Sequence, residues 1–289
     1  MKGIVYNAGA YFEPDNAKIS IFDRGFLYGD SIYETLRVYK TRPFALGDHL
    51  DRFTISAEKV YFELPWSKSQ LEKTVHDTIT KSGLQDAYLR IIATRGGGVI
   101  GLDPSLATEP QLVVICLELP KLPEEHYTKG ISAHIVDVTR NLIKSLDPQA
   151  KTGNYMNSIL AVAEAKRKGA QEAIMLDYQG RVTEASASNL FAKISGVWCT
   201  PPLSVGILDG ITRRAILAAC KQANMPAEER MLSAQDLLNA TEMFFCGSVK
   251  EVVPVILLNQ KSIASGVVGD DTKRVMQLYK QFVQNFFNN

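Results

Sequence analysis

The chain has 289 residues, of which 46% are hydrophobic and 22% charged, so it is long enough for one large or two ordinary domains with a sizeable core. A formal net charge of +1 gives no electrostatic reason to expect nucleic acid or an acidic membrane as a partner, which leaves small molecules as the expected ligands. The N-terminus lacks the apolar segment of a signal peptide, and no run approaches the ~18 apolar residues of a membrane span, so we expect a cytoplasmic protein.

Two β-strands are predicted early in the chain, at residues 31–39 and 87–98, because side chains of different character alternate along them. One face of the first strand carries Tyr33, Thr35, Arg37 and Tyr39. Its other face carries Ile32, Glu34, Leu36 and Val38. One face of the second strand carries Tyr88, Arg90, Ile92 and Thr94. Each strand therefore presents a tyrosine with an arginine, and such pairs can hold a carboxylate.

Helices are predicted between these two strands. Residues 46–64 and 67–83 have apolar side chains at the three- and four-residue spacing of an amphipathic helix. Residues 111–119 then form an apolar run that indicates a buried strand. The first part of the chain is therefore expected to mix strands and helices.

A domain boundary is predicted where Pro120 and Pro123 bracket a polar turn. We place the linker at residues 120–126. It would join a small N-terminal α+β domain of residues 1–119 to a larger C-terminal domain of residues 127–289.

Strands and helices also alternate in the C-terminal part. Strands are expected at 131–139 and within 172–200, with hairpin turns at Gln179-Gly180 and Ser195-Gly196. Helices are expected at 155–168, 212–224, 234–240 and 272–287. Ser233, followed by Asp236, is the expected cap of the third of these.

The cysteines do not form a recognisable framework. They are Cys116, Cys199, Cys220 and Cys246, and no two of them have the paired spacing of a disulfide scaffold or a zinc knuckle. We expect buried free thiols.

Lys151 is the first candidate for chemistry, in the polar stretch AKTGNYMNS ahead of the helical pattern that begins at Tyr155. A lysine amine is a useful nucleophile only when its surroundings lower its pKa or offer it a carbonyl partner. The spacing of four residues places Lys151 and Tyr155 near the start of one predicted helix, within reach of a common ligand. A solvated surface lysine is the alternative.

Two segments have features of an anion site. Gly210, Ile211 and Thr212 precede an amphipathic helix, whose first N–H groups and dipole favour phosphate, although threonine is also a routine helix cap. In the turn CGS, Gly247 would let backbone N–H groups approach an anion, and Ser248 would add a hydroxyl donor. An ordinary turn between two strands is the alternative.

Glu184, at a predicted strand end in GRVTEASASN, adds a carboxylate, although a lone glutamate there is normally just exposed. A lysine, a phosphate cup in two segments and a carboxylate together meet the requirements of pyridoxal phosphate. Its aldehyde needs a lysine, its phosphate needs a cup, and its ring nitrogen needs an acid. These residues therefore predict a pyridoxal-phosphate site.

The sequence resembles the fold-type IV pyridoxal-phosphate enzymes, and among them most closely the branched-chain amino-acid aminotransferases. The resemblance runs, in the family's order, through FDRGFLYGDSIYETLRVY, HLDRF, YLRIIATRGGGVIGLDP, LDPQAKTGNYMNSILA, QGRVTEASASNLF, LDGITRR and CGSVKEVVPV. It implies an α/β (α+β) enzyme of two domains, with a β-barrel-like core in the larger one and the active site in the cleft between them.

For the cofactor, the resemblance implies that Lys151 forms a Schiff base with pyridoxal 5'-phosphate and shuttles a proton. Glu184 would pair with the pyridine nitrogen, and Tyr155 would bind the ring hydroxyl. The phosphate would be held by Arg52, Ile211, Thr212, Gly247 and Ser248.

For the substrate, the resemblance implies that Tyr88 holds the α-carboxylate with the turn amides near Ser248 and Val249. The pocket would be shaped by Tyr33, Thr35, Arg37 and Arg90. Arg90 would also bind the γ-carboxylate of glutamate, because a guanidinium fork matches a carboxylate. Tyr28 would reach the neighbouring subunit's site, which implies a homodimer. The expected reaction is a ping-pong transfer of the amino group of an L-amino acid, with leucine, isoleucine or valine favoured, to 2-oxoglutarate.

Two positions leave alternatives within the family open. Thr35 stands where the branched-chain enzymes usually have glycine, and the aminodeoxychorismate lyases have threonine. Ala185 in EASASN is closer to the lyase or D-amino-acid aminotransferase pattern. A protein that binds the cofactor without turnover and a Schiff-base lyase that uses Lys151 without cofactor are more remote alternatives.

Overall fold

The structure, a computed structural model, describes residues 1–288. The chain folds into two compact units. The first unit consists of residues 1–121 together with 150–154, and the second consists of residues 122–149 together with the chain from residue 155 onward.

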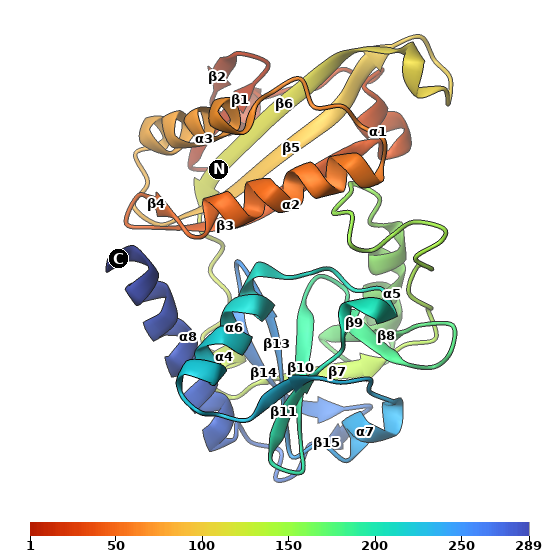
Figure 1. The fold of residues 1–289 in the computed structure, drawn as a ribbon, viewed down its shortest axis with the longest axis vertical. Helices are drawn as coiled ribbons and strands as arrows, with labels where there is room; N and C mark the ends of the chain where they lie inside the picture. Colours follow the sequence, from red (N-terminus) through yellow and green to blue (C-terminus); the bar gives the residue numbers. More distant parts are fainter. Residues whose placement is uncertain (289) are drawn as a thin grey trace. The chain divides into compact units, whose positions relative to one another are not determined.

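The first unit is built on a six-stranded sheet in which every strand pairs antiparallel with its neighbour. In spatial order its strands are β2 (Ala10–Phe12), β1 (Gly3–Asn7), β6 (Ala107–Glu118), β5 (Ala87–Gly98), β3 (Ser31–Tyr39) and β4 (Arg42–Pro43). Its helices are α1 (Arg24–Tyr28), α2 (Leu46–Lys59) and α3 (Lys68–Ser82), with short 3-10 turns η1 (Pro14–Asn16) and η2 (Pro104–Leu106). The long helices α2 and α3 pack on the apolar face of this sheet (Figure 1).

The alternation along β3 explains how this face is covered. Ile32, Leu36 and Val38 have no exposed surface and belong to the same core as Leu50 and Phe53 of α2. Burying each such side chain stabilises the fold by about 1.5–3 kcal/mol. The opposite face of β3 is thereby left for other contacts.

The sequence-based predictions for this unit are confirmed apart from one helix end. Both strands that carry tyrosine and arginine have the predicted bounds. The two helical patterns form α2 and α3, but the first pattern is too long, because α2 ends at Lys59 and Tyr61 has a left-handed φ of 53°. α3 begins with a capping box between Ser67 and Gln70, and it ends at Gly83, whose φ of 65° is left-handed.

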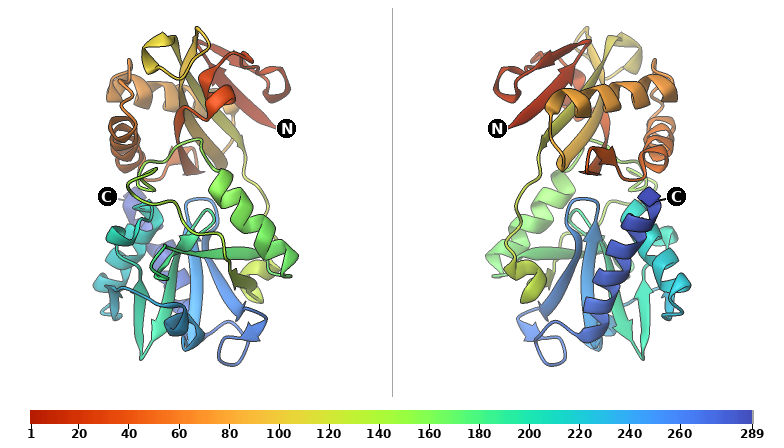
Figure 2. Two further views of the ribbon diagram at one scale, coloured as in Figure 1. Left: turned by 90° about the vertical axis from the view of Figure 1, so that its right-hand side faces the viewer. Right: turned by 90° about the vertical axis from the view of Figure 1, so that its left-hand side faces the viewer.

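The second unit contains a nine-stranded mixed sheet. In spatial order its strands are β12 (Ala227–Glu229), β11 (Val197–Thr200), β10 (Asn189–Ile194), β13 (Glu242–Gly247), β14 (Glu251–Leu258), β7 (Ile131–Ile135), β8 (Glu172–Leu176) and β9 (Val182–Ala185), with β15 (Lys261–Ser262) beside β14. Its helices are α4 (Glu125–Thr128), α5 (Met156–Arg167), α6 (Ile211–Gln222), α7 (Ala234–Leu238) and α8 (Asp270–Asn288), with the 3-10 turn η3 (Leu203–Val205). The sheet curls into a half-barrel in which β9 also contacts β10 (Figure 2), as the expected β-barrel-like core requires.

The predicted hairpin turn at Ser195-Gly196 and the predicted helix cap at Ser233 are both present in this unit. Ser195 and Gly196 have φ values of 50° and 84°, which is the geometry of a two-residue hairpin turn between β10 and β11. Ser233 caps α7, because its hydroxyl accepts a hydrogen bond from the Asp236 N–H and the Asp236 carboxylate accepts one from the Ser233 N–H.

The predicted strand at 131–139 is too long, because β7 ends at Ile135. The N–H groups of Asp137 and Val138 donate to the carboxylate of Glu164 at 2.9 and 3.2 Å and so leave the strand ladder.

The segment 150–154, assigned to the C-terminal domain from the sequence, packs in the first unit. The Tyr33 N–H donates to the Lys151 carbonyl at 2.9 Å, and the Gly153 N–H donates to the Ser31 carbonyl at 2.8 Å. The segment therefore pairs with the first residues of β3.

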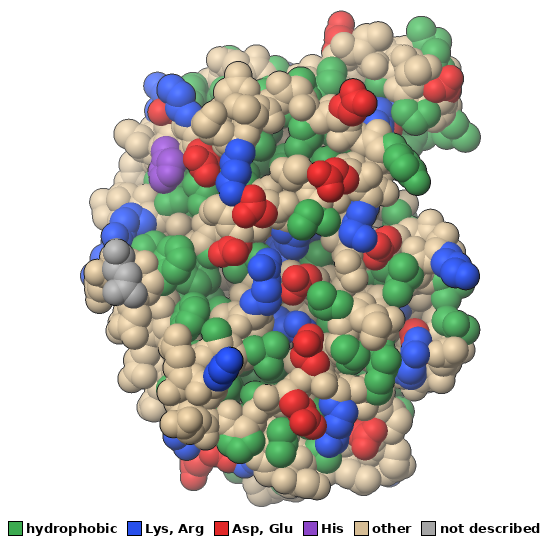
Figure 3. Space-filling view, viewed as in Figure 1, with side chains coloured by type: hydrophobic (Ala, Val, Ile, Leu, Met, Phe, Trp, Pro, Cys, Tyr) green, Lys and Arg blue, Asp and Glu red, His purple; other side chains and the backbone are tan. Residues whose placement is uncertain are grey.

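The four cysteines are free and buried, as expected. Within residues 1–288, no helix is long and apolar enough to cross a membrane, and no cluster of His, Cys, Asp or Glu is arranged to hold a metal ion. On the face shown in Figure 3, basic and acidic side chains are interspersed, in keeping with the net charge of +1.

Candidate active site

Lys151 is fixed by its backbone on both sides. Its N–H donates to the Ser56 hydroxyl of α2 at 3.0 Å, and its carbonyl accepts from the Tyr33 N–H of β3 at 2.9 Å. Its amine nitrogen lies 4.5 Å from the centroid of the Tyr33 ring. The backbone and the amine of Lys151 therefore lie beside the start of β3.

The tyrosine and arginine side chains of β3 and β5 share one face of the first sheet, as predicted. Thr35 pairs with Arg90, and Arg37 pairs with Tyr88, so these four residues are direct cross-strand neighbours. The Arg90 guanidinium lies 4.1 Å from the centroid of the Tyr33 ring. The buried Nε of Arg90 has no hydrogen-bond partner among residues 1–288. This face can bind a carboxylate.

Arg52 of α2 lies on the apolar side of the same strand, where it binds Glu34. Its Nε and one terminal nitrogen donate to the two carboxylate oxygens of Glu34 at 2.7 and 2.6 Å. His49 Nδ1 lies 2.7 Å from the same carboxylate. Burial raises the pKa of Glu34, but Arg52 and His49 outweigh this effect and lower it to about 2. Burial lowers the pKa of His49, against the opposing effect of Glu34.

Tyr28 is the last residue of α1, and 36% of its surface is exposed. Asp23 caps this helix by accepting from the Gly25 N–H at 2.7 Å, and its other oxygen accepts from the Thr94 hydroxyl of β5 at 2.7 Å. The Arg24 guanidinium lies 5.2 Å from the centroid of the Tyr28 ring.

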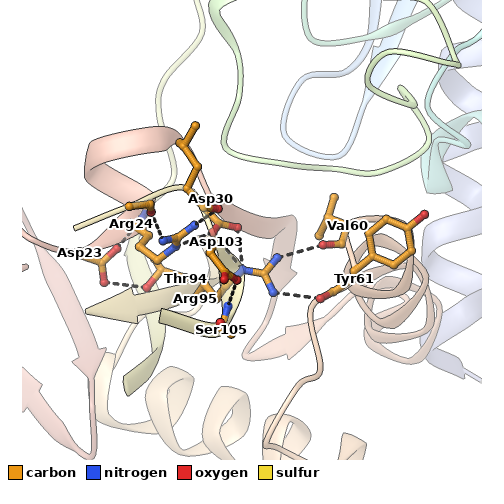
Figure 4. A network of polar contacts seen from close by, with 12 residues as sticks. Asp23, Arg24, Asp30, Val60, Tyr61, Thr94, Arg95, Asp103 and Ser105 are labelled. Atoms are coloured by element: carbon orange, nitrogen blue, oxygen red, sulfur yellow. Dashed lines mark hydrogen bonds and ion pairs between the residues drawn. The ribbon is translucent and has the colours of Figure 1, made fainter. Parts of the chain in front are cut away.

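A polar network anchors α1 to the rest of the first unit (Figure 4). Arg24 Nε and Arg95 Nε each donate to one oxygen of Asp30 at 2.9 Å. The terminal nitrogens of Arg95 donate to the carbonyls of Val60 and Tyr61, just beyond α2, at 2.9 Å. The position of Tyr28 is therefore tied to both β5 and α2.

Glu184 of β9 belongs to the second unit, and its carboxylate is 5% exposed rather than on the surface. Arg140 donates to one of its oxygens at 2.7 Å. The other oxygen accepts from the Asn189 side chain at 3.2 Å and from the Leu208 N–H at 3.1 Å. Tyr155, also in this unit, is the N-cap residue of α5.

The sequence analysis missed Arg140 and Asn189. Arg140 lies in an irregular segment, where no periodicity marks a functional position. Asn189 carried a signal, because it closes the small-residue run that follows Glu184.

Helix α6 begins at Ile211, so Gly210, and not Thr212, is its N-cap. No side chain caps this end, although Ile211 and Thr212 are only 5% and 2% exposed. The first N–H groups of a helix need an external acceptor. A buried helix start without a side-chain cap therefore suits an anion.

The turn predicted at CGS lies two residues further on, because β13 ends at Gly247 and β14 begins at Glu251. Ser248 and Val249 thus lie in the turn itself. A Cβ at Gly247 would lie 3.8 Å from the hydroxyl oxygen of Ser188, so the turn adjoins the loop before β10. The buried Ser188 hydroxyl has no hydrogen-bond partner within residues 1–288. It is a second donor group suited to an anion at this end of the sheet.

Known proteins resemble this chain in sequence and in fold. Residues 31–258 match the model of the family described as Amino-transferase class IV. The putative branched-chain-amino-acid aminotransferase of Methanocaldococcus jannaschii is 36% identical over 276 residues, which cover 96% of this chain and 95% of that protein. The D-alanine aminotransferase of Bacillus licheniformis is 29% identical over 272 residues, which cover 94% of each.

A solved structure also has this fold. The T.th. branched-chain amino acid aminotransferase with pyridoxamine 5'-phosphate superposes with a TM-score of 0.93 at 30% sequence identity. The match covers 99% of this chain and 95% of that one.

We predict that Glu34→Gln destabilises the protein by about 3 kcal/mol at pH 7, because it leaves the buried Arg52 without its counter-ion. The folded pKa of Glu34, about 2, is below its ordinary value of 4.5. The contribution of Glu34 to the free energy of unfolding is therefore complete above pH 4.5 and is lost as the pH falls towards 2. The difference between the urea midpoints of Glu34→Gln and wild type should therefore become smaller as the pH falls over this range. Glu58→Gln, on the exposed side of α2, is the control. A gap that stays constant with pH would contradict this account.

Proposed function

The chain belongs to the class IV aminotransferases, and on this premise we propose that it moves the amino group of an L-amino acid, with branched-chain residues favoured, to 2-oxoglutarate. The reaction would be ping-pong, with pyridoxal 5'-phosphate as the carrier of the amino group. The observation that supports this most strongly is the placement of Lys151. Its backbone is held on both sides, and its amine lies over Tyr33, on the face that carries Arg90.

The residues fit the cofactor. When bound, pyridoxal phosphate supplies a carbonyl that accepts the amino group and a ring that withdraws electrons from the reacting carbon. Lys151 would bind the cofactor's aldehyde carbon and then move a proton at the substrate Cα. Glu184, oriented by Arg140 and Asn189, would hold a proton at the ring nitrogen. Tyr155 would donate to the ring hydroxyl.

The phosphate would bind where the second unit has unsatisfied donors. The uncapped start of α6 offers the N–H groups of Ile211 and Thr212, and the neighbouring segments add Ser188 and Ser248. Arg52 would bind the same phosphate from the first unit, with Glu34 fixing the direction of its fork.

The polar face of β3 and β5 would bind the substrate. Tyr88 and the turn at Ser248 and Val249 would hold the α-carboxylate, while Tyr33 and Arg37 would line the pocket. The buried Nε of Arg90 would then serve the γ-carboxylate of glutamate, which makes 2-oxoglutarate the natural acceptor.

A D-amino-acid aminotransferase is the second candidate, and an aminodeoxychorismate lyase is a third within the same fold. The likeness to the D-alanine aminotransferase favours the second. Thr35, which is paired with Arg90 on the polar face, supports the third, and Ala185 supports both. One methyl group in a pocket changes preference by about 1–3 kcal/mol.

We further propose that the chain works as a homodimer with Tyr28 reaching the partner's site. The surface around α1 supports this, because it exposes a group of large apolar side chains that we call the α1 apolar surface. It consists of Phe22, Phe26, Leu27, Val99, Ile100 and Leu102. Arg24 joins its two segments by donating to the carbonyls of Gly101 and Leu102. Apolar groups gathered in this way mark an interaction site.

We predict that Phe26→Asp shifts the protein from dimer to monomer in sedimentation equilibrium and lowers its activity in parallel. The reason is that a charge in the α1 apolar surface opposes burial. Tyr178→Asp, at an exposed site of the second unit, is the control and should stay dimeric. A wild-type protein that is monomeric while it turns over would contradict the homodimer.

We predict that Lys151→Ala lowers the rate of glutamate formation from leucine and 2-oxoglutarate by about 10²-fold to 10⁴-fold or more, because the proton at Cα loses its carrier. Circular dichroism should show an intact fold. Lys166→Ala, an exposed lysine of α5, should leave the rate unchanged. Normal turnover by Lys151→Ala would refute the proposed mechanism.

A further inference from the structure

Glu172, the first residue of β8, is a buried carboxylate that the proposed mechanism does not use. It is 7% exposed. One of its oxygens accepts from the Ala173 N–H at 3.0 Å and from the Ser186 hydroxyl. The other accepts from the ammonium of Lys250 at 3.2 Å. A buried carboxylate with three donors of different kinds is held in one orientation.

The partners of Glu172 come from two segments that are distant in the sequence. Ser186 opens the loop between β9 and β10, and this loop is closed by the Ala185 N–H, which donates to the Ser188 carbonyl at 2.8 Å. Lys250 is the last residue of the turn between β13 and β14. Glu172 therefore joins the loop that carries Ser188 to the turn that carries Ser248.

Gly247 shows that these two segments adjoin. A Cβ at this position would lie 3.8 Å from the Ala187 carbonyl oxygen and 3.9 Å from Lys250 Cγ. It would also lie 3.8 Å from the Ser188 hydroxyl, the buried group without a partner in the described part of the chain. The donor groups proposed for the phosphate therefore flank the link made by Glu172.

The turn is held from a second direction as well. The Tyr127 hydroxyl of α4 donates to the Lys250 carbonyl at 3.2 Å. Glu251, which follows, has a φ of 56°, a conformation that a residue with a side chain adopts only when its neighbours enforce it. The side chain and the backbone of Lys250 are thus both fixed, which is more than a plain hairpin turn needs.

We propose that Glu172 is a positioning residue for the phosphate site. By binding Ser186 and Lys250 at once, it sets the spacing between the loop with Ser188 and the turn with Ser248. It also keeps the Lys250 ammonium away from the anion, so that the turn's backbone and hydroxyl groups make the contacts. This inference rests on the proposed function, since it concerns the phosphate of the same cofactor.

The test is a comparison of two ligands in binding titrations of the cofactor-free protein. Pyridoxamine 5'-phosphate carries the phosphate and pyridoxamine lacks it, and neither forms a bond with Lys151. We expect Glu172→Gln to weaken binding of pyridoxamine 5'-phosphate about tenfold, because a charged link between the two segments is lost. Binding of pyridoxamine should be unchanged.

Glu242→Gln is a closely matched control. The Glu242 carboxylate likewise binds a lysine, which is Lys193. It also accepts hydrogen bonds from the hydroxyl and the N–H group of Thr272. These contacts hold the start of α8 and none of the segments joined by Glu172. Glu242→Gln should therefore bind both ligands as the wild type does.

Ser186→Ala keeps the test decisive if Glu172→Gln does not fold. It removes only the hydroxyl that donates to the Glu172 carboxylate, and it should weaken binding of pyridoxamine 5'-phosphate about threefold while leaving binding of pyridoxamine unchanged. The proposal would be overturned if affinity for both ligands fell equally or did not fall at all. It would also be overturned if the phosphorylated ligand bound more tightly because Lys250 had been released. A wild-type protein that does not distinguish the two ligands would instead refute the proposed phosphate site.

Discussion

The pairing of the segment around Lys151 with the start of β3 is the constraint on which the rest of the site depends. Two backbone hydrogen bonds, from Tyr33 to Lys151 and from Gly153 to Ser31, make this segment an extension of the first sheet. With the backbone held in this way, the Lys151 amine lies over the Tyr33 ring, which Arg90 also contacts. A reactive amine is useful only at a defined position, and here strand geometry supplies it.

In the described part of the second unit, some buried polar groups have hydrogen-bond partners and others have none. Glu184 is oriented by Arg140 and Asn189, whereas the start of α6 and the Ser188 hydroxyl are left for a ligand. Unsatisfied buried groups of this kind reduce stability, and the proposed phosphate would supply an acceptor for them.

The sequence predicted what local patterns encode and failed where long-range contacts decide. The alternation along β3 was enough to separate its two faces. That Glu34 binds Arg52 followed from no pattern, because tertiary packing brings the helix to the strand. The spacing of four residues related Lys151 to Tyr155, whereas its hydrogen bonds to β3 and Ser56 followed from no local pattern. Arg140 gave no signal at all.

The central claim is that this face receives an L-amino acid and passes its amino group to the bound cofactor. The most direct measurement mixes the holoenzyme separately with L-leucine, L-glutamate and D-alanine, without any 2-oxo acid, and follows the visible band of the cofactor. The account predicts loss of the band with L-leucine and L-glutamate only. Loss with D-alanine alone, or with none of the three, would contradict it.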